Sequence, residues 1–133
     1  MGNRAVIKVE GSKTGIYLHW NGGRESVNAF LRAAKDLGVR SPVGDTSYFY
    51  ARLTQIIGNF FGGAISLGVD SVDKLDTDNG DNGTFVVGPD FKIVRTLYHR
   101  HHGGMPTKET TDYEEGVYQD VMRINKPLFE RNG

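Results

Sequence analysis

The chain has 133 residues, of which 38% are hydrophobic and 24% are charged, and its sequence contains no cysteine. This length fits one domain with one core, and the lack of cysteine excludes disulfides, thiolate metal ligands and a cysteine nucleophile. No apolar run approaches the roughly 20 residues that cross a bilayer, and the charges of Arg4, Lys8 and Glu10 do not fit a signal peptide. We therefore expect a protein of the cytoplasm that does not insert into membranes.

The charges balance in number but are distributed unevenly along the chain. Residues 1–63 carry eight basic and four acidic side chains, whereas residues 64–90 carry one lysine and six aspartates. A surface that binds long nucleic acids needs more continuous positive charge than this. A small anion needs only two or three arginines together with backbone N–H groups. The distribution therefore favours a compact anionic ligand over a long nucleic acid.

Two short segments at the start of the chain have the pattern of a β-hairpin. Residues 3–9, NRAVIKV, place Ala5, Ile7 and Val9 on one face, and residues 15–20, GIYLHW, are rich in aromatic and branched side chains. The stretch EGSKTG that spans the connection contains turn-forming residues. The sequence therefore predicts two antiparallel strands.

Two amphipathic helices are expected next. Apolar residues recur at helical spacing over residues 27–37, and Gly38 is a suitable end for this helix. After the loop VRSPVGDTS, a second apolar face extends over residues 49–61, with either Thr46 or Ser47 available as the N-cap. The two consecutive glycines that follow can end this helix in a left-handed conformation.

Four short segments in the second half of the chain are predicted as strands, namely AISLGVD, SVDKLD, TFVVG and FKIVRTLYH. The stretches DNGDNG and PD between the later segments favour hairpin turns. Because strands and helices are segregated along the chain, we expect an α+β fold. Residues 1–133 would form a single domain in which an antiparallel sheet carries about three helices.

The C-terminal part is predicted as a loop and a helix. Residues 101–108, HHGGMPTK, are expected to form a mobile loop. The last helix is expected over residues 111–124, with Thr111 as its cap and Glu114 three residues further on. Pro127 is expected to end it.

The strand-to-helix connection WNGGRES, residues 20–26, has the features of a small-molecule anion site. Its two glycines let the backbone bend closely around a ligand, and a helix start presents unpaired N–H groups with about half a positive charge. Arg24 can add a bidentate guanidinium contact, and Trp20 can stack a purine. The alternative is an ordinary connection, with Trp20 in the core and Arg24 in solvent.

Other candidate binding residues carry less specific signals. Arg52, in the second predicted helix, either covers apolar surface with its stem or reaches a ligand. Asn79 or Asn82, in the DNGDNG stretch, can present an amide to the hydrogen-bonding edge of a ligand. Arg95 and Arg100 belong to a basic segment and can hold a phosphate if their strand borders the pocket.

Metal sites and catalytic sites have little support in the sequence. Asp76, Asp78 and Asp81 invite comparison with a calcium loop, but the glycine and the oxygen ligands fall at the wrong positions and no glutamate closes the loop. His99 and His101 would share one face of a strand, but no third ligand has a clear spacing. Common serine-hydrolase, zinc-protease and kinase motifs are missing from the sequence. We therefore expect no metal, no cofactor and no enzyme activity.

Five stretches of the chain, taken in order, resemble a known family. They are NRAVI, GIYLHWNGGRESVNAFL, ARLTQIIGNFFGG, SLGVD and LDTDNGDNG. These strings are similar to those of short phage and prophage proteins associated with the Thoeris anti-defence sponges, which bind cyclic ADP-ribose isomers made by bacterial immune enzymes and hold them without cleavage. The likeness covers about residues 3–85 and leaves the C-terminal third uncovered.

The resemblance implies a phage protein that works by affinity in the cytoplasm of an infected bacterium and needs no cofactor. It implies ligand contacts at Trp20, Asn21 and Arg24, which lie inside the matching motif, and at Arg52 and Asn59. Cyclic oligonucleotides are further ligands of related members. The resemblance also implies a homo-oligomer, either a dimer or a larger assembly such as a hexamer, whose pockets lie between subunits.

Two other functions are compatible with the sequence. A nucleotide-cleaving enzyme would use the histidines and carboxylates for acid-base catalysis. A protein-targeted inhibitor of a bacterial immune effector, such as an anti-CRISPR, would instead present a polar and aromatic surface without a preformed pocket.

Overall fold

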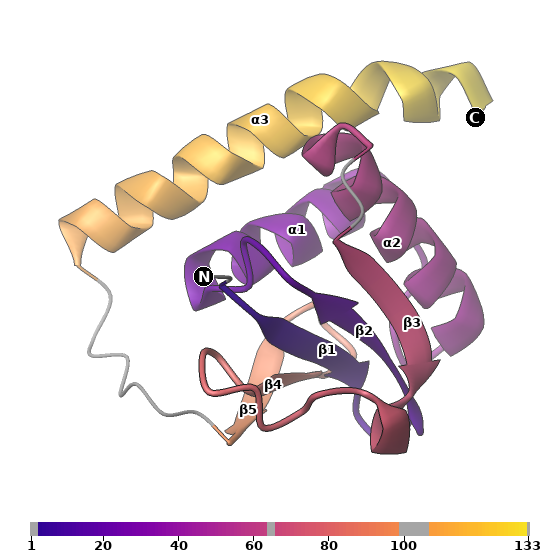
Figure 1. The fold of residues 1–133 in the computed structure, drawn as a ribbon. Coiled ribbons are helices and arrows are strands. Elements are labelled where there is room, and N and C mark those ends of the chain that lie inside the picture. The colour runs from indigo at the N-terminus through magenta and orange to yellow at the C-terminus, as the bar shows by residue number, and fades with distance from the viewer. Residues whose placement is uncertain (1–2, 64–65, 99–106, 133) are drawn as a thin grey trace.

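One sheet, two helices packed on it and a long third helix make up the fold (Figure 1). The structure is a computed structural model that describes residues 3–63, 66–98 and 107–132. The strands are β1 (Ala5–Val9), β2 (Thr14–Leu18), β3 (Leu67–Ser71), β4 (Thr84–Val87) and β5 (Ile93–Leu97). The helices are α1 (Arg24–Asp36), α2 (Thr46–Phe61), α3 (Lys108–Asn132) and the short 3-10 helix η1 (Val72–Lys74). This arrangement confirms the predicted α+β class.

The five strands are ordered β3-β2-β1-β4-β5 in one sheet. The predicted β1–β2 hairpin is confirmed, with Ile7 opposite Ile16 in an antiparallel pair. On its other side Ile7 lies beside Phe85 in β4, and this pair of strands is parallel. All other neighbours are antiparallel. The sheet is therefore largely antiparallel, as expected, with one parallel pair at its centre.

The core lies between the sheet and the helices. Alternation along β1 turns Ala5, Ile7 and Val9 toward the helices, where all three are buried. Phe30 and Leu31 of α1 are fully buried against the same cluster. Burial of each large apolar side chain stabilises the fold by about 1.5–3 kcal/mol. The long helix α3 packs across α1 and α2 (Figure 1).

The predicted strand over residues 71–76 is wrong. This segment forms η1 and then leads the chain across the outer face of the sheet to the start of β4. A β-carbon on Gly15 of β2 would lie 3.2 Å from Leu75 Cδ1, which shows how closely this segment covers the sheet. Because the chain must cross the sheet to place β4 parallel to β1, the expected hairpin between residues 71–76 and β4 does not form.

The first two helices follow the sequence pattern except at one cap. Gly38 follows α1 with a φ of 87°, and Gly62 ends α2 with a φ of 71°, as predicted. The N-cap of α2 is neither Thr46 nor Ser47. Asp45 takes this position, and its side chain accepts a hydrogen bond from the backbone N–H of Tyr48.

The third helix is longer than predicted at both ends. It begins at Lys108, where Thr107 Oγ1 accepts a hydrogen bond from Thr110 N at 3.1 Å, so Thr107 replaces Thr111 as the cap. Pro127 lies inside the helix and does not end it. Proline removes the hydrogen bond to the carbonyl of Arg123, but both residues are exposed, so water can satisfy that carbonyl. Of the predicted loop, residues 101–106 lie outside the described residues.

Candidate functional site

The connection between β2 and α1 is held against the residues before β1, at the end of the sheet where β1 begins and β2 finishes. Asn3 N donates to His19 O at 2.9 Å, and Gly22 N donates to Asn3 O at 2.8 Å. Asn21, between them, has a φ of 53°, a left-handed conformation that asparagine tolerates better than most residues. The side chain of Asn21 makes no hydrogen bond with the described residues. The sharp bend thus occurs at Asn21 and not at the two glycines.

The two glycines have different physical roles. A β-carbon on Gly22 would lie 2.6 Å from Asn3 O and 2.9 Å from Ala5 N, so only glycine fits there. Gly23 is the N-cap of α1 and has a φ of −64°, which any residue can adopt. A β-carbon on Gly23 would make only ordinary contacts, at 3.6 Å. Gly22 is therefore required by packing, whereas Gly23 can be replaced by a residue with a small side chain.

The first turn of α1 presents unpaired donors. No side chain caps the helix, and the N–H groups of residues 23–26 have no hydrogen-bond acceptor within the described part of the chain. Ser26 is only 1% exposed, and its Oγ also has no partner there. These donors lie at the positive end of the helix dipole.

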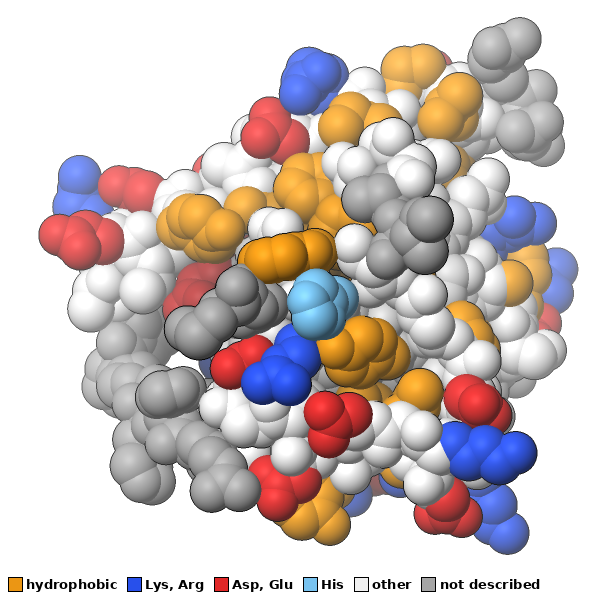
Figure 2. Space-filling view, viewed as in Figure 1, with side chains coloured by type: hydrophobic (Ala, Val, Ile, Leu, Met, Phe, Trp, Pro, Cys, Tyr) orange, Lys and Arg blue, Asp and Glu red, His pale blue; other side chains and the backbone are white. Residues whose placement is uncertain are grey.

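An exposed guanidinium and an exposed indole flank this helix start. Arg24 makes one long hydrogen bond, from Nη1 to Thr96 Oγ1 at 3.3 Å, and forms no ion pair with the described residues. Trp20 is 44% exposed, and its ring meets His19 edge-on with the ring centroids 5.1 Å apart. Figure 2 shows hydrophobic and charged side chains gathered around a histidine on this face. Both side chains are therefore available to a ligand.

Asn82 joins the site from the loop before β4. Its Nδ2 donates to Asn3 Oδ1 at 2.6 Å and to Arg4 O at 3.0 Å, and its backbone N–H donates to Arg4 O at 3.1 Å. Asn82 was a predicted ligand contact, whereas no pattern in the sequence pointed to Asn3. The two residues are 79 positions apart, and no local pattern links them.

The aspartates near this loop are directed at an arginine. Arg4 Nε donates to Asp81 Oδ2 at 2.8 Å, and Arg4 Nη1 lies 3.8 Å from Asp76 Oδ2. These contacts occupy two of the three carboxylates considered for calcium. Tyr17 lies nearby, and burial raises its pKa while the charge of Arg4 opposes this shift. The loop therefore uses Arg4 to balance part of its negative charge.

The remaining predicted residues lie elsewhere. Arg52 Nη1 donates to Gln55 Oε1 at 2.8 Å, and its guanidinium lies 5.1 Å from the ring centre of Tyr48 on α2. Asn59 contacts α3 through a hydrogen bond to Asn125. The guanidinium of Arg95 pairs with Glu10, which follows the opposite end of β1 from Asn3. Arg100 lies outside the described residues. Of the predicted residues, Trp20, Asn21 and Arg24 thus belong to the connection between β2 and α1, and Asn82 is linked to this connection through Asn3.

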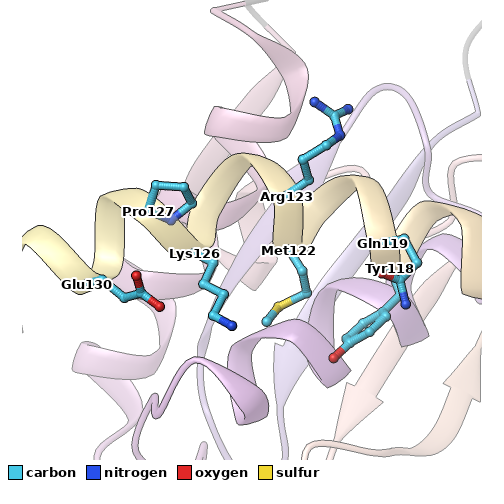
Figure 3. A pocket seen from close by; sticks show the side chains of 7 residues that line it. All are labelled: Tyr118, Gln119, Met122, Arg123, Lys126, Pro127 and Glu130. Atoms are coloured by element: carbon cyan, nitrogen blue, oxygen red, sulfur yellow. The ribbon is translucent and has the colours of Figure 1, made fainter.

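Two hollows on the described surface do not include these residues. One, of about 440 Å³, lies between α2 and the β1–β2 turn, and most of the residues that line it carry a hydroxyl group, among them Ser12 and Tyr50. The other, of about 560 Å³, runs along α3 (Figure 3). Figure 3 shows Tyr118, Met122 and Lys126 on one side of that helix. Neither hollow includes the residues at the start of α1.

Among the described residues, no three histidine, aspartate or glutamate side chains come together as metal ligands. His99 and His101, considered for zinc, lie outside these residues. None of the helices, as far as the chain is described, has both the length and the apolar character needed to cross a membrane. No family model, curated protein or solved structure matches this chain.

Proposed function

We propose that this protein binds a cyclic nucleotide immune signal, of the cyclic ADP-ribose type, and holds it without cleaving it. It would act as a phage anti-defence sponge in the cytoplasm of an infected bacterium. One observation carries the proposal. The N–H groups at the start of α1, which have no acceptor among the described residues, are close in sequence to the guanidinium of Arg24, which forms no ion pair there, and to the exposed indole of Trp20.

The chemistry of these groups matches the parts of such a ligand. Pyrophosphate oxygens accept hydrogen bonds from backbone N–H groups at a helix start, where the dipole favours negative charge. A guanidinium adds a charge-assisted contact to the same anion. An indole face stacks on a purine with about 1–3 kcal/mol per base. The amide of Asn21, which follows Trp20 in the chain, can bind a ribose hydroxyl.

Self-association belongs to the same proposal. Ligand pockets commonly bury 70–90% of a small molecule, whereas the donors at the start of α1 lie outside both hollows described above. A second copy of the chain that covers this surface would enclose the ligand. We therefore propose a homo-oligomer, either a dimer or a larger assembly such as a hexamer.

Calorimetric titration with cyclic ADP-ribose isomers, followed by heat release and chromatography of the ligand, tests the proposal. We expect binding and the release of ligand with unchanged mass. Arg24→Ala should weaken binding by about 10- to 100-fold, the range for loss of a charged hydrogen bond. Arg123→Ala is the matched control, because Arg123 is an exposed arginine of α3 that pairs only with Asp120 among the described residues.

Three outcomes would contradict the proposal. Ligand released with an altered mass would indicate a nucleotide-cleaving enzyme. Failure of every isomer to bind, together with co-purification of a host immune effector, would indicate a protein-targeted inhibitor. Equal affinities of the wild type and of folded Arg24→Ala would remove the start of α1 as the site.

A further inference from the structure

We propose that β3 is a self-association surface, at which the same strand of a second copy of this chain pairs antiparallel and joins the two sheets. The inference names an interface for the homo-oligomer of the proposed function, so it rests on that part of the proposal. It depends neither on the nucleotide nor on the start of α1.

The backbone of β3 carries hydrogen-bonding groups that its own sheet does not use. β3 is the outermost strand, and within the described chain it pairs only with β2 (Figure 1). Directly after β3, Val72 N donates to Lys13 O at 2.7 Å, and directly before it, Ser66 O accepts from His19 N at 3.0 Å. Even-numbered positions therefore face β2, and the positions between them face the open edge. These are Leu67, Val69 and Ser71.

A hollow lies beside this edge, on the face of the sheet that packs against the helices. Val69 is paired with Ile16, a buried core residue, so its side chain is directed to the same face, yet it is 55% exposed. It lines the hollow of about 440 Å³ together with Ala51 and Thr54 of α2. When a strand is added to a sheet edge, backbone hydrogen bonds hold it and pockets beside the edge accept alternate side chains. The edge and the hollow therefore fit the same kind of occupant, an extended strand.

The residues of β3 are self-complementary in one antiparallel register. With a two-fold axis at Val69, every residue of β3 is paired, and Val69 lies directly opposite Val69 of the second copy. The N–H and C=O groups of these two residues bond reciprocally, and Leu67 N donates to Ser71 O of the second copy. A shifted register would pair fewer residues of β3. The strand thus supplies a suitable partner for its own edge.

The charges of β3 also fit this register. Asp70 is the one charged residue of the strand, and it would lie opposite Gly68 of the second copy, so like charges do not face each other directly. Its carboxylate accepts a hydrogen bond from Ser71 N at 2.7 Å. The residues that line the hollow are all uncharged, as are the residues of the second copy that would face it. Neither face of the joined sheet therefore brings like charges directly together.

The other edge strand, β5, is less suited to pairing. The register between β4 and β5 shifts between Val86 and Val87, and Arg95 places a charge in β5. Bulges and charged side chains are common means of keeping a sheet edge from pairing. Val94 of β5 is 50% exposed, almost as much as Val69. It is therefore a matched control position.

Oxidative cross-linking of a single cysteine tests the inference in the full chain, which contains no cysteine of its own. Val69→Cys would place two thiols opposite each other in a pair whose Cα atoms are about 5.5 Å apart, within the range of a disulfide. With copper phenanthroline as the oxidant, we expect a linked dimer on a non-reducing gel. Val94→Cys should link much more slowly. Equal rates for the two variants would overturn the inference.

Val69→Lys and Val69→Glu test the register. Each variant alone would place like charges opposite each other and remove an apolar contact, so self-association should weaken by about 10- to 100-fold in analytical ultracentrifugation. An equimolar mixture should associate again, because the two charges then have opposite signs. Val94→Lys should associate as the wild type does. Circular dichroism checks that the variants fold, which the exposure of Val69 favours. A mixture that stays dissociated would overturn the pairing of Val69 with its own copy.

The inference and the proposed function can fail separately. If the wild type associates and Val69→Lys and Val69→Glu associate equally well, the inference is overturned and another surface holds the oligomer. A monomeric wild type would overturn both the inference and the proposed oligomer, and would leave this edge to a strand of a different protein. If no cyclic ADP-ribose isomer binds while association still depends on Val69, the ligand of the proposed function is overturned and the inference is supported.

Discussion

The side-chain amide of Asn59 donates a hydrogen bond to Asn125 Oδ1, 2.9 Å away, in the contact between α2 and α3. Asn125 is fully buried, and its Nδ2 donates to Ile56 O at 3.2 Å and to Val121 O at 2.9 Å. Every polar group of this buried amide is thus satisfied by the two helices. Asn59, a predicted ligand contact, thus joins α2 to α3.

Asn59→Ala should therefore destabilise the protein. It leaves Asn125 Oδ1 buried without a donor, which costs about 1–3 kcal/mol of unfolding free energy. Urea denaturation of both proteins measures this difference, with Gln55→Ala as an exposed control on the same helix. Unchanged stability together with lost nucleotide binding would show that Asn59 serves the ligand and not the fold.

The two glycines of the turn should respond differently to alanine. Gly22→Ala places a methyl group 2.6 Å from Asn3 O and 2.8 Å from Ala5 Cβ, so we expect a loss of about 1–3 kcal/mol. Gly23→Ala meets no close atom and should cost about 0.5–1 kcal/mol, through the poorer N-cap. The methyl group of Gly23→Ala would, however, fill space above the helix start and weaken anion binding. Thermal unfolding measures the stability of both variants, and titration measures their anion binding. Equal stabilities of Gly22→Ala and Gly23→Ala would contradict the prediction.

Tyr50 links α2 to the first hairpin. Its hydroxyl accepts a hydrogen bond from Val9 N at 2.8 Å and donates one to Thr14 O at 2.6 Å. Tyr50→Phe leaves the N–H of Val9 buried without an acceptor, so we expect a loss of about 1–3 kcal/mol at neutral pH. Guanidinium denaturation of the wild type and of Tyr50→Phe measures this loss of unfolding free energy. A loss near zero would mean that water replaces the hydroxyl.

The same residue predicts a pH dependence. Burial raises the pKa of Tyr50 above its ordinary value of 10.0, so the folded state holds this proton more tightly than the unfolded state. The corresponding stability is fully present below pH 10.0 and is lost as the pH rises through the folded-state pKa. The difference in unfolding free energy between the wild type and Tyr50→Phe should therefore become smaller when denaturation is repeated at increasingly alkaline pH. A gap that stays constant would argue against the burial effect.

Glu25 should oppose the proposed ligand. Its Oε2 lies 3.6 Å from the position of a β-carbon on Gly23, so its negative charge is close to the N–H groups of the first turn. Glu25→Gln removes this charge and should tighten pyrophosphate binding by about 2- to 10-fold, since charges at a helix start contribute about 0.3–1 kcal/mol or somewhat more when partly buried. Weaker binding after this change would indicate that Glu25 contacts the ligand as an acceptor.

Elements with strong periodicity were predictable from the sequence. The alternation in β1 and the apolar stripe of α1 each describe one buried face, and the glycines after α1 and α2 supply the left-handed ends. The segment over residues 71–76 was not predictable in this way. A segment that covers a sheet and a strand that pairs within it both bury apolar side chains, so their sequence patterns are similar. The length of α3 also depends on tertiary contacts, since the buried Asn125 holds it to α2.

The candidate site was predictable only where it is local in sequence. Trp20, Asn21 and Arg24 occur in one connection, and the unpaired N–H groups follow from a helix start. The partners of the other polar residues come from distant parts of the chain, as for Arg95 with Glu10 and for Asn82 with Asn3. A sequence pattern indicates that such side chains are polar, but only the fold shows which partner each one meets.

Native mass spectrometry of the protein, after incubation with lysate from bacteria whose cyclic-nucleotide immune enzyme is activated, tests the central claim most directly. It reports the number of subunits and the mass of the bound ligand in one measurement. We expect an oligomer that carries an intact cyclic nucleotide, and the Arg24→Ala protein should carry none. A protein without nucleotide, or one that holds a cleaved product, would contradict the account.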